Sequence, residues 1–155
     1  MEARSATVAT LKVLDVNLLL YAVNRDSAHH ATCRLWLERM LSSEEPVALP
    51  WAVLLGFLRL STSPRILPDP LHPGQALEVI EGWLAQPSVL ALAPGPDHWR
   101  ILRTLIEETG TAGNLTTDAH LAALAIENGA ELCSTDTDFA WFPRLRWTNP
   151  VAGHG

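Results

Sequence analysis

Three short stretches decide the fold of this chain. They are VLDVNLLLYA at residues 13–22, LTTDAHLAALA at 115–125 and STDTDFAWF at 134–142. In each stretch, an aspartate stands where an apolar strand is expected to end or a helix to begin. The carboxyl ends of parallel strands lie along one rim of a sheet, and ligands of α/β proteins bind at that rim. We therefore expect four carboxylates to converge there, those of Asp15, Asp118, Asp136 and Asp138.

Helical and strand-like segments alternate along the rest of the chain. Short apolar strands are expected over residues 10–16, 46–50, 88–93, 131–133 and 144–147. Helices are expected over residues 17–24, 28–41, 51–61, 73–85, 97–109 and 117–128, with a short turn or helix over 136–142. Asn17 and Ser27 are the expected N-terminal caps of the first two helices. This alternation predicts an α/β fold, with a central parallel sheet of about five short strands and helices on both faces.

Length and composition narrow the class of protein. The 155 residues show no break in composition, so we expect a single domain over 1–155. No segment approaches the roughly 18 apolar residues of a membrane span, and the first residues lack the pattern of a signal peptide. We therefore expect a soluble, cytoplasmic protein. The net charge of −6 argues against broad, non-specific nucleic-acid binding, although it allows a local rim of arginines.

Carboxylates gathered at one rim have a direct chemical use, because their oxygens are the ligands that Mg²⁺ and Mn²⁺ prefer. Each aspartate also has a structural alternative. Asp118 suits a helix N-terminus, and Asp136 and Asp138 suit turns. Asp15 at the end of a buried strand must be paired or reach solvent in a cleft. Together the four favour a cation site, since like charges crowd together where a cation compensates them.

In their order and spacing, these motifs resemble the PIN domain. The resemblance rests on V-L-D-x-N at 13–17, T-D-A-H-L-A-A-L-A at 117–125 and S-T-D-x-D-F at 134–139, and it extends over essentially the whole chain. More narrowly, the motifs resemble the VapC-type toxins of bacterial toxin–antitoxin pairs. The resemblance implies an endoribonuclease that uses Mg²⁺ or Mn²⁺ to hydrolyse RNA. It also implies a homodimer and a VapB-like antitoxin as partner.

The resemblance implies a role for each acidic residue when it is carried over by position. Asp15 and Asp118 are expected to be the principal metal ligands, and Asp136 to complete the set. Asp138 is expected to ligate through water or to orient the other carboxylates. Asn17 is expected to hydrogen-bond to the ligands. All four aspartates are thus expected to be catalytic.

One position departs from the family pattern. Gly56 lies in the third helix, where many PIN nucleases carry a glutamate. The loss of a carboxylate would weaken the attraction for a cation. This supports a second reading, in which the chain is a catalytically weak PIN-fold module that binds other proteins. Arg59 and Arg25 are the candidate substrate-binding residues, because a guanidinium suits phosphate, although a solvated surface charge is the open alternative for both.

A phosphatase of the haloacid-dehalogenase type is a third candidate class, because such enzymes also place an aspartate after the first strand. They require D-x-D at that point and a lysine further along the chain. Here the sequence reads Asp15-Val16-Asn17, and no lysine follows Lys12. These departures set the phosphatase reading aside.

Overall fold

The computed structural model describes residues 10–152. Five parallel strands form one sheet in the order β3-β2-β1-β4-β5. Their bounds are Lys12–Leu14 for β1, Val47–Pro50 for β2, Val89–Leu92 for β3, Glu131–Cys133 for β4 and Arg146–Thr148 for β5. Because the strands are parallel, the residues that follow β1 and β4 meet at the same edge of the sheet. This arrangement confirms the predicted fold class.

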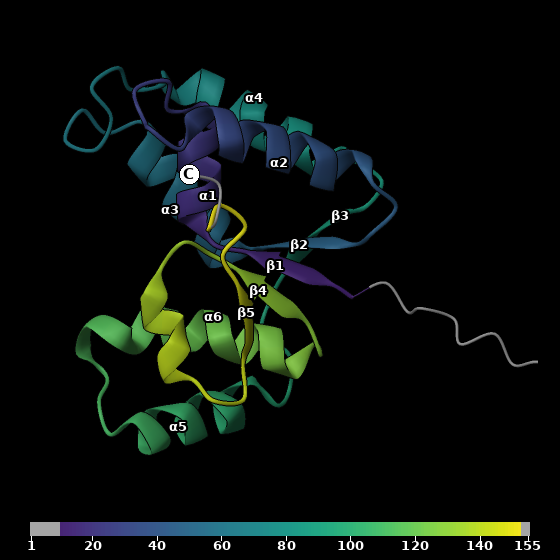
Figure 1. Cartoon of the computed structure of the whole chain (residues 1–155), viewed down its shortest axis with the longest axis vertical. Helices are drawn as coiled ribbons and strands as arrows, with labels where there is room; N and C mark the ends of the chain where they lie inside the picture. Colours follow the sequence, from purple (N-terminus) through teal and green to yellow (C-terminus); the bar gives the residue numbers. More distant parts are fainter. Residues whose placement is uncertain (1–9, 153–155) are drawn as a thin grey trace, which may run out of the picture.

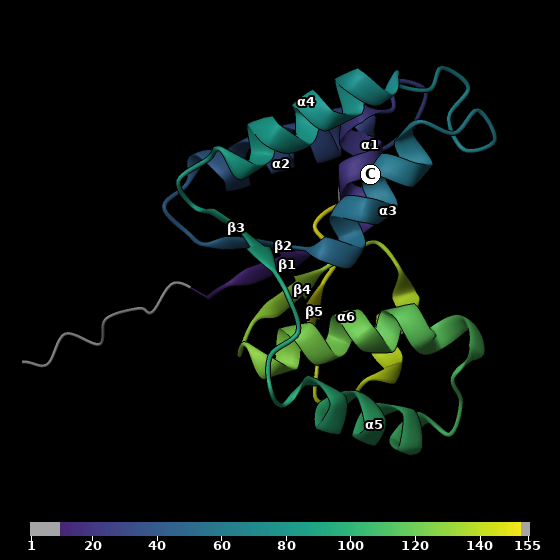
Figure 2. The ribbon, with the colours of Figure 1, turned by 180° about the vertical axis from the view of Figure 1, so that it is seen from behind.

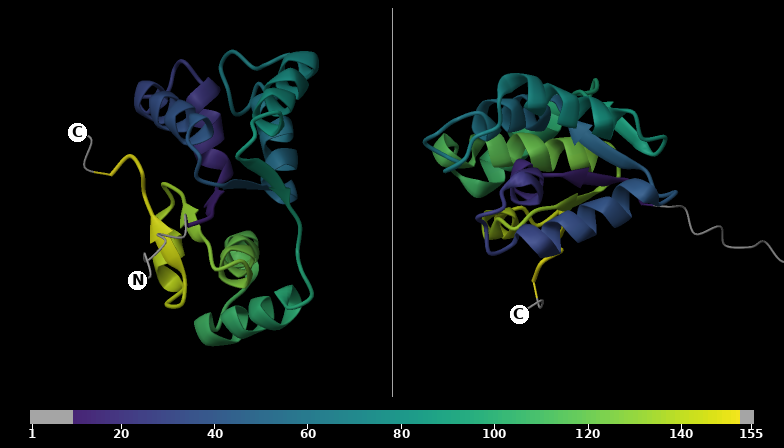
Figure 3. Two further views of the ribbon diagram at one scale, coloured as in Figure 1. Left: turned by 90° about the vertical axis from the view of Figure 1, so that its right-hand side faces the viewer. Right: turned by 90° about the horizontal axis from the view of Figure 1, so that it is seen from above.

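Helices cover both faces of the sheet. One face carries α1 (Val16–Val23), α2 (His30–Ser42), α3 (Trp51–Ser61) and α4 (Pro73–Leu84) (Figure 1). The other face carries α5 (His98–Thr109) and α6 (Thr116–Glu127), as the reverse and side views also show (Figures 2 and 3). Two short 3₁₀ helices complete the chain, η1 (Gly113–Leu115) and η2 (Thr137–Trp141). Among the described helices, none has both the length and the apolar character needed to cross a membrane.

The core explains why the inner strands are rich in apolar residues. Val13, Leu14, Leu49 and Leu132 are all fully buried, because the sheet is covered on both faces. Helix α6 lies between the sheet and α5, and six of its residues are buried: Ala119, Leu121, Ala122, Ala123, Leu124 and Ala125. The small alanine side chains let α6 approach its neighbours closely. Its first turn is thereby fixed close to the edge of the sheet.

Two predicted helix caps were wrong. The first helix begins at Val16 and not at Asn17, and its cap is Asp15, whose side chain accepts a hydrogen bond from the Val16 N–H. The chain therefore turns into α1 directly after β1. The second helix begins at His30, with His29 in the cap position. Ser27 instead accepts a hydrogen bond from the His29 N–H, which stabilises a turn before the helix.

Candidate metal centre

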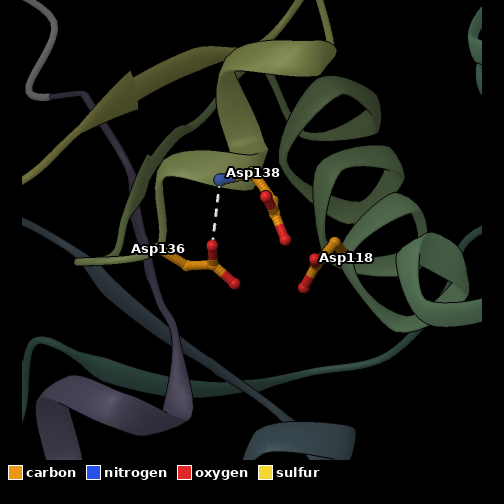
Figure 4. A group of neighbouring side chains, drawn as sticks. All are labelled: Asp118, Asp136 and Asp138. Atoms are coloured by element: carbon orange, nitrogen blue, oxygen red, sulfur yellow. Dashed lines mark hydrogen bonds between the residues drawn. The ribbon is translucent and has the colours of Figure 1, made fainter.

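Three carboxylates meet at the edge of the sheet (Figure 4). Asp118 lies in the first turn of α6, whereas Asp136 and Asp138 belong to the segment that follows β4. One carboxylate oxygen from each residue lies within 4.8 Å of the other two. Asp118 and Asp136 are half-buried, and Asp138 is exposed. Two elements far apart in sequence thus supply one compact group of oxygen ligands.

Local hydrogen bonding fixes the two aspartates after β4. Asp136 is the N-cap of η2, and its Oδ1 accepts a hydrogen bond of 2.9 Å from the Asp138 N–H (Figure 4). Asp136 therefore stabilises a turn, which is the structural role that its position in the sequence also allowed. The same turn aims Asp136 and Asp138 at Asp118, so the structural role and a ligand role are compatible.

Asp15 lies beside this group and outside the set of three. Its Oδ1 accepts a hydrogen bond of 2.7 Å from the Val16 N–H, and its Oδ2 accepts one of 2.6 Å from the Ser134 hydroxyl. The side chain is almost completely buried. The sequence predicted Asp15, Asp118 and Asp136 as direct ligands, whereas the group within 4.8 Å contains Asp138 in place of Asp15. A ligand role for Asp15 stays a prediction.

The carboxylates repel one another. The pKa of Asp118 is raised from 3.8 to about 6, first by burial and then by the negative charges of Asp136, Asp15 and Asp138. Burial also raises the pKa of Asp15, against the lowering effect of hydrogen bonds from Ser134 and Val16. The ion pairs found within residues 10–152 all lie elsewhere. The group therefore lacks a protein cation over the described part of the chain, and a divalent ion would supply the missing charge.

Ser134 is a site residue that the sequence reasoning missed. It directly follows β4 and is fully buried. Its hydroxyl donates to Asp15 Oδ2, and it accepts hydrogen bonds from the Asp136 N–H at 3.0 Å and from Asn17 Nδ2 at 3.3 Å. A usable signal was present, because a serine stands between the end of an apolar strand and the acidic turn.

Asn17 provides a test of whether the residues suit a hydrated cation. Its Nδ2 is bonded to Ser134, but its Oδ1 is buried and has no hydrogen-bond partner among the described residues. A buried acceptor without a partner is costly unless water or another donor satisfies it. The atoms that could coordinate a cation here, those of four carboxylates and this amide, are all oxygen atoms. That set fits Mg²⁺ or Mn²⁺ and does not resemble a zinc or copper site.

Gly56 lies on α3, where that helix packs against α1. A Cβ atom added at Gly56 would lie 3.6 Å from Cγ2 of Val16, which is an ordinary contact. Val16 directly follows Asp15, so this face of α3 points toward the start of α1 beside the acidic group. A side chain at position 56 would therefore fit near the site.

The two candidate substrate-binding arginines lie on the surface. Arg59, in the last turn of α3, and Arg25, after α1, are both exposed. No hydrogen bond or ion pair within residues 10–152 joins either side chain to the aspartates. A role of either arginine in binding substrate stays a prediction.

A histidine pair lies behind the first turn of α6. His98 Nε2 and His120 Nδ1 are 2.9 Å apart, and the rings meet edge to face. His120 lies two residues after Asp118 but bonds to α5. Burial lowers the pKa of both histidines, and the charge of His98 lowers that of His120 further. The pair thus ties α6 to α5, which helps to fix the helix that carries Asp118.

Comparisons with known proteins agree with this geometry. Residues 12–145 match the PIN domain family. The chain is 43% identical to VapC ribonuclease Mb2897 of Mycobacterium bovis over 90% of this chain and 95% of that protein. It is 42% identical to ribonuclease VapC37 of Mycobacterium tuberculosis over 92% of this chain and 99% of that protein.

Solved structures share the fold. VapBC2 from Rickettsia felis, bound to a DNA fragment from its promoter, has a TM-score of 0.64 at 22% identity and covers 90% of this chain and 98% of its own. VapBC-1 from Haemophilus influenzae has a TM-score of 0.66 at 15% identity and covers 91% and 98%. The fold, the acidic group and the sequence relatives lead to one conclusion, which confirms the resemblance seen in the motifs. This chain belongs to the PIN domain family and, within it, to the VapC ribonucleases.

Proposed function

We propose that this chain is a Mg²⁺- or Mn²⁺-dependent endoribonuclease that acts as the toxin of a type II toxin–antitoxin module. The observation that carries the proposal is the group of three carboxylates whose oxygens lie within 4.8 Å of one another. It occurs in a chain whose relatives are named ribonucleases. The raised pKa of Asp118 adds support, because a bound divalent cation would offset the burial and the carboxylate repulsion that raise it.

The residues divide the work by position. Asp118, Asp136 and Asp138 would hold the cation, and Asp15 would act beside them, as a ligand or through its negative charge. A divalent cation, when bound, polarises the scissile phosphate and makes a water molecule nucleophilic near neutral pH. Asn17 Oδ1, which lacks a partner among residues 10–152, would accept a hydrogen bond from a water molecule of the site and so orient it.

Arg59 and Arg25 would bind phosphates of the RNA away from the acidic group. Both are exposed, and neither takes part in an ion pair within residues 10–152. Their charges are therefore available to a polyanion. This division suits an acidic protein, since a few local contacts hold the substrate and the cation supplies positive charge at the cut.

We further propose a VapB-like antitoxin as partner, a homodimer as the assembled toxin and the cytoplasm as the place of action. The similar solved structures from Rickettsia felis and Haemophilus influenzae are VapBC complexes, which supports an antitoxin for this chain. Co-expression with a candidate VapB-like antitoxin, followed by size-exclusion chromatography, tests both assemblies.

A second function has one observation in its favour. Gly56 provides no carboxylate beside the start of α1, so the acidic group is smaller than the family pattern implies. A weakened site would leave a PIN-fold module whose main role is to bind other proteins. This module would still bind an antitoxin, but it would not cut RNA.

Cleavage of total cellular RNA separates the two functions. Purified, antitoxin-free protein is incubated with Mg²⁺ or Mn²⁺, with EDTA and the Asp15→Asn variant as controls, and the new 5′ ends are mapped by sequencing. The proposal requires discrete cuts that vanish in both controls. Folded protein that binds Mn²⁺ in calorimetry yet makes no cuts would contradict the nuclease function and favour the binding module.

A further inference from the structure

The hydroxyl of Ser134 makes every hydrogen bond that it can make. A serine hydroxyl has one proton and two acceptor positions. Here the hydroxyl donates a hydrogen bond of 2.6 Å to Asp15 Oδ2. Its oxygen accepts hydrogen bonds from the Asp136 N–H at 3.0 Å and from Asn17 Nδ2 at 3.3 Å. Ser134 therefore has no lone pair left for a cation. Its contacts join the end of β1, the first turn of α1 and the acidic turn after β4.

The backbone of Ser134 is fixed from the other side by β5. Its N–H donates to the Thr148 carbonyl at 3.1 Å, and its carbonyl accepts a hydrogen bond of 3.0 Å from Nε1 of Trp147. Trp147 is half-buried and packs against the core. Strand β5 is an edge strand, so these contacts anchor residue 134 to an element that itself supplies none of the acidic side chains.

We propose, building on the proposed function, that Ser134 is a positioning residue for the acidic group and that Trp147 holds Ser134 in place. Ser134 sets Asp136 directly, and Asp136 in turn fixes Asp138 through the 2.9 Å bond to its N–H. The same hydroxyl sets Asp15. One atom thus determines the spacing between the carboxylate that follows β1 and the two carboxylates that follow β4.

Removal of the hydroxyl has a defined consequence. The Asp136 N–H and Asp15 Oδ2 each lose a partner at a largely buried place, and both would turn toward water or toward new partners. The acidic turn would then be free to shift relative to β1, and the oxygens would no longer be preorganised for one cation. Loss of residues that orient metal ligands weakens metal binding by about 10- to 100-fold.

Mn²⁺ binding to the full-length, metal-free protein tests this role without a cleavage assay. Isothermal titration calorimetry would compare the wild type with Ser134→Ala, Ser134→Thr and Trp147→Phe, and urea unfolding would confirm that each variant is folded. Ser134→Ala is expected to raise the Kd by about tenfold or more, and Ser134→Thr, which keeps the hydroxyl, to restore most of the affinity. Trp147→Phe keeps the ring and removes the N–H, and it is expected to raise the Kd by a smaller factor. Trp99→Phe is its control, because Trp99 is 70% exposed.

The outcomes are distinct. Folded Ser134→Ala with the Kd of the wild type would overturn the role of Ser134, and Trp147→Phe indistinguishable from Trp99→Phe would overturn that of Trp147. If Ser134→Ala does not fold, Trp147→Phe decides the proposal alone. Failure of the wild type itself to bind Mn²⁺ would instead contradict the proposed function, so the two failures cannot be confused.

Discussion

Neutralising Asp118 should stabilise the metal-free protein while it removes a proposed metal ligand. In the folded protein the pKa of Asp118 is raised from 3.8 to about 6, first by burial and then by Asp136, Asp15 and Asp138. Between these pH values the folded state binds more protons than the unfolded state. The free energy of unfolding therefore falls as pH rises through this window. Above about pH 6 Asp118 is ionised in the folded protein, and the full loss of stability from this buried charge is present. The Asp118→Asn variant lacks this cost.

The magnitude follows from the same pKa. Each pKa unit corresponds to about 1.4 kcal/mol, so the rise to about 6 sets an upper limit of about 3 kcal/mol. Solvent reaches part of the Asp118 side chain and screens its charge. Asparagine also loses the favourable interaction of a carboxylate with the first turn of α6, worth about 0.3–1 kcal/mol. We expect a net gain of about 1–2 kcal/mol at pH 7.5, which corresponds to roughly 2–8 °C in Tm for a chain of this size.

Urea unfolding in EDTA at pH 4.5 and pH 7.5 measures this effect. Asp69→Asn is the matched control, because Asp69 is exposed and has no ion pair within residues 10–152. The gain from Asp118→Asn should be clear at pH 7.5 and small at pH 4.5, where the folded wild type keeps the proton. A variant that is less stable than the wild type at pH 7.5, or a gain that does not change with pH, would refute the electrostatic reasoning.

Three further predictions concern the cation and the substrate. Gly56→Glu should tighten Mn²⁺ binding in calorimetry relative to Gly56→Ala, because the added Cβ lies 3.6 Å from Val16 beside Asp15; equal affinities would show that the new carboxylate points elsewhere. The Mn²⁺ affinity of the wild type should fall by up to tenfold per pH unit below about pH 6, since protons compete for Asp118; a constant affinity between pH 5 and 7.5 would argue against Asp118 as a ligand. Arg59→Ala and Arg25→Ala should weaken RNA binding in filter-binding assays by a few-fold at low salt and leave Mn²⁺ affinity unchanged; RNA affinity equal to that of the wild type would assign both arginines to the solvated surface.

Much of the fold followed from the sequence, because apolar strands covered on both faces leave a strong pattern. The runs at 46–50 and 88–93 lack alternation, and they form β2 and β3. Strand β2 is fully buried, as expected for an inner parallel strand, whereas β3 lies at the edge of the sheet and is only partly buried. Helix caps were harder to place. Asp15, read only as a candidate ligand, also caps α1, because the chain turns into the helix immediately after β1.

The sequence predicted the position of the site in the fold, but it did not predict the contacts between the side chains. Strand ends show which residues share an edge of the sheet, and Asp118, Asp136 and Asp138 do meet there. Periodicity cannot show where each side chain points. The sequence therefore did not predict that Asp138, and not Asp15, would belong to the compact group. Ser134 was missed for a related reason, because its partner Asp15 lies 119 residues away along the chain.

Anomalous diffraction from crystals soaked in Mn²⁺ would show whether a cation binds at this edge of the sheet, because it places the ion relative to named carboxylates. We expect a peak between Asp118, Asp136 and Asp138, with Asp15 beside it. The peak should disappear in Asp118→Asn crystals that keep the same fold. A strong Mn²⁺ peak elsewhere on the protein, or none in crystals soaked well above the Kd measured in solution, would contradict a metal centre at this edge of the sheet.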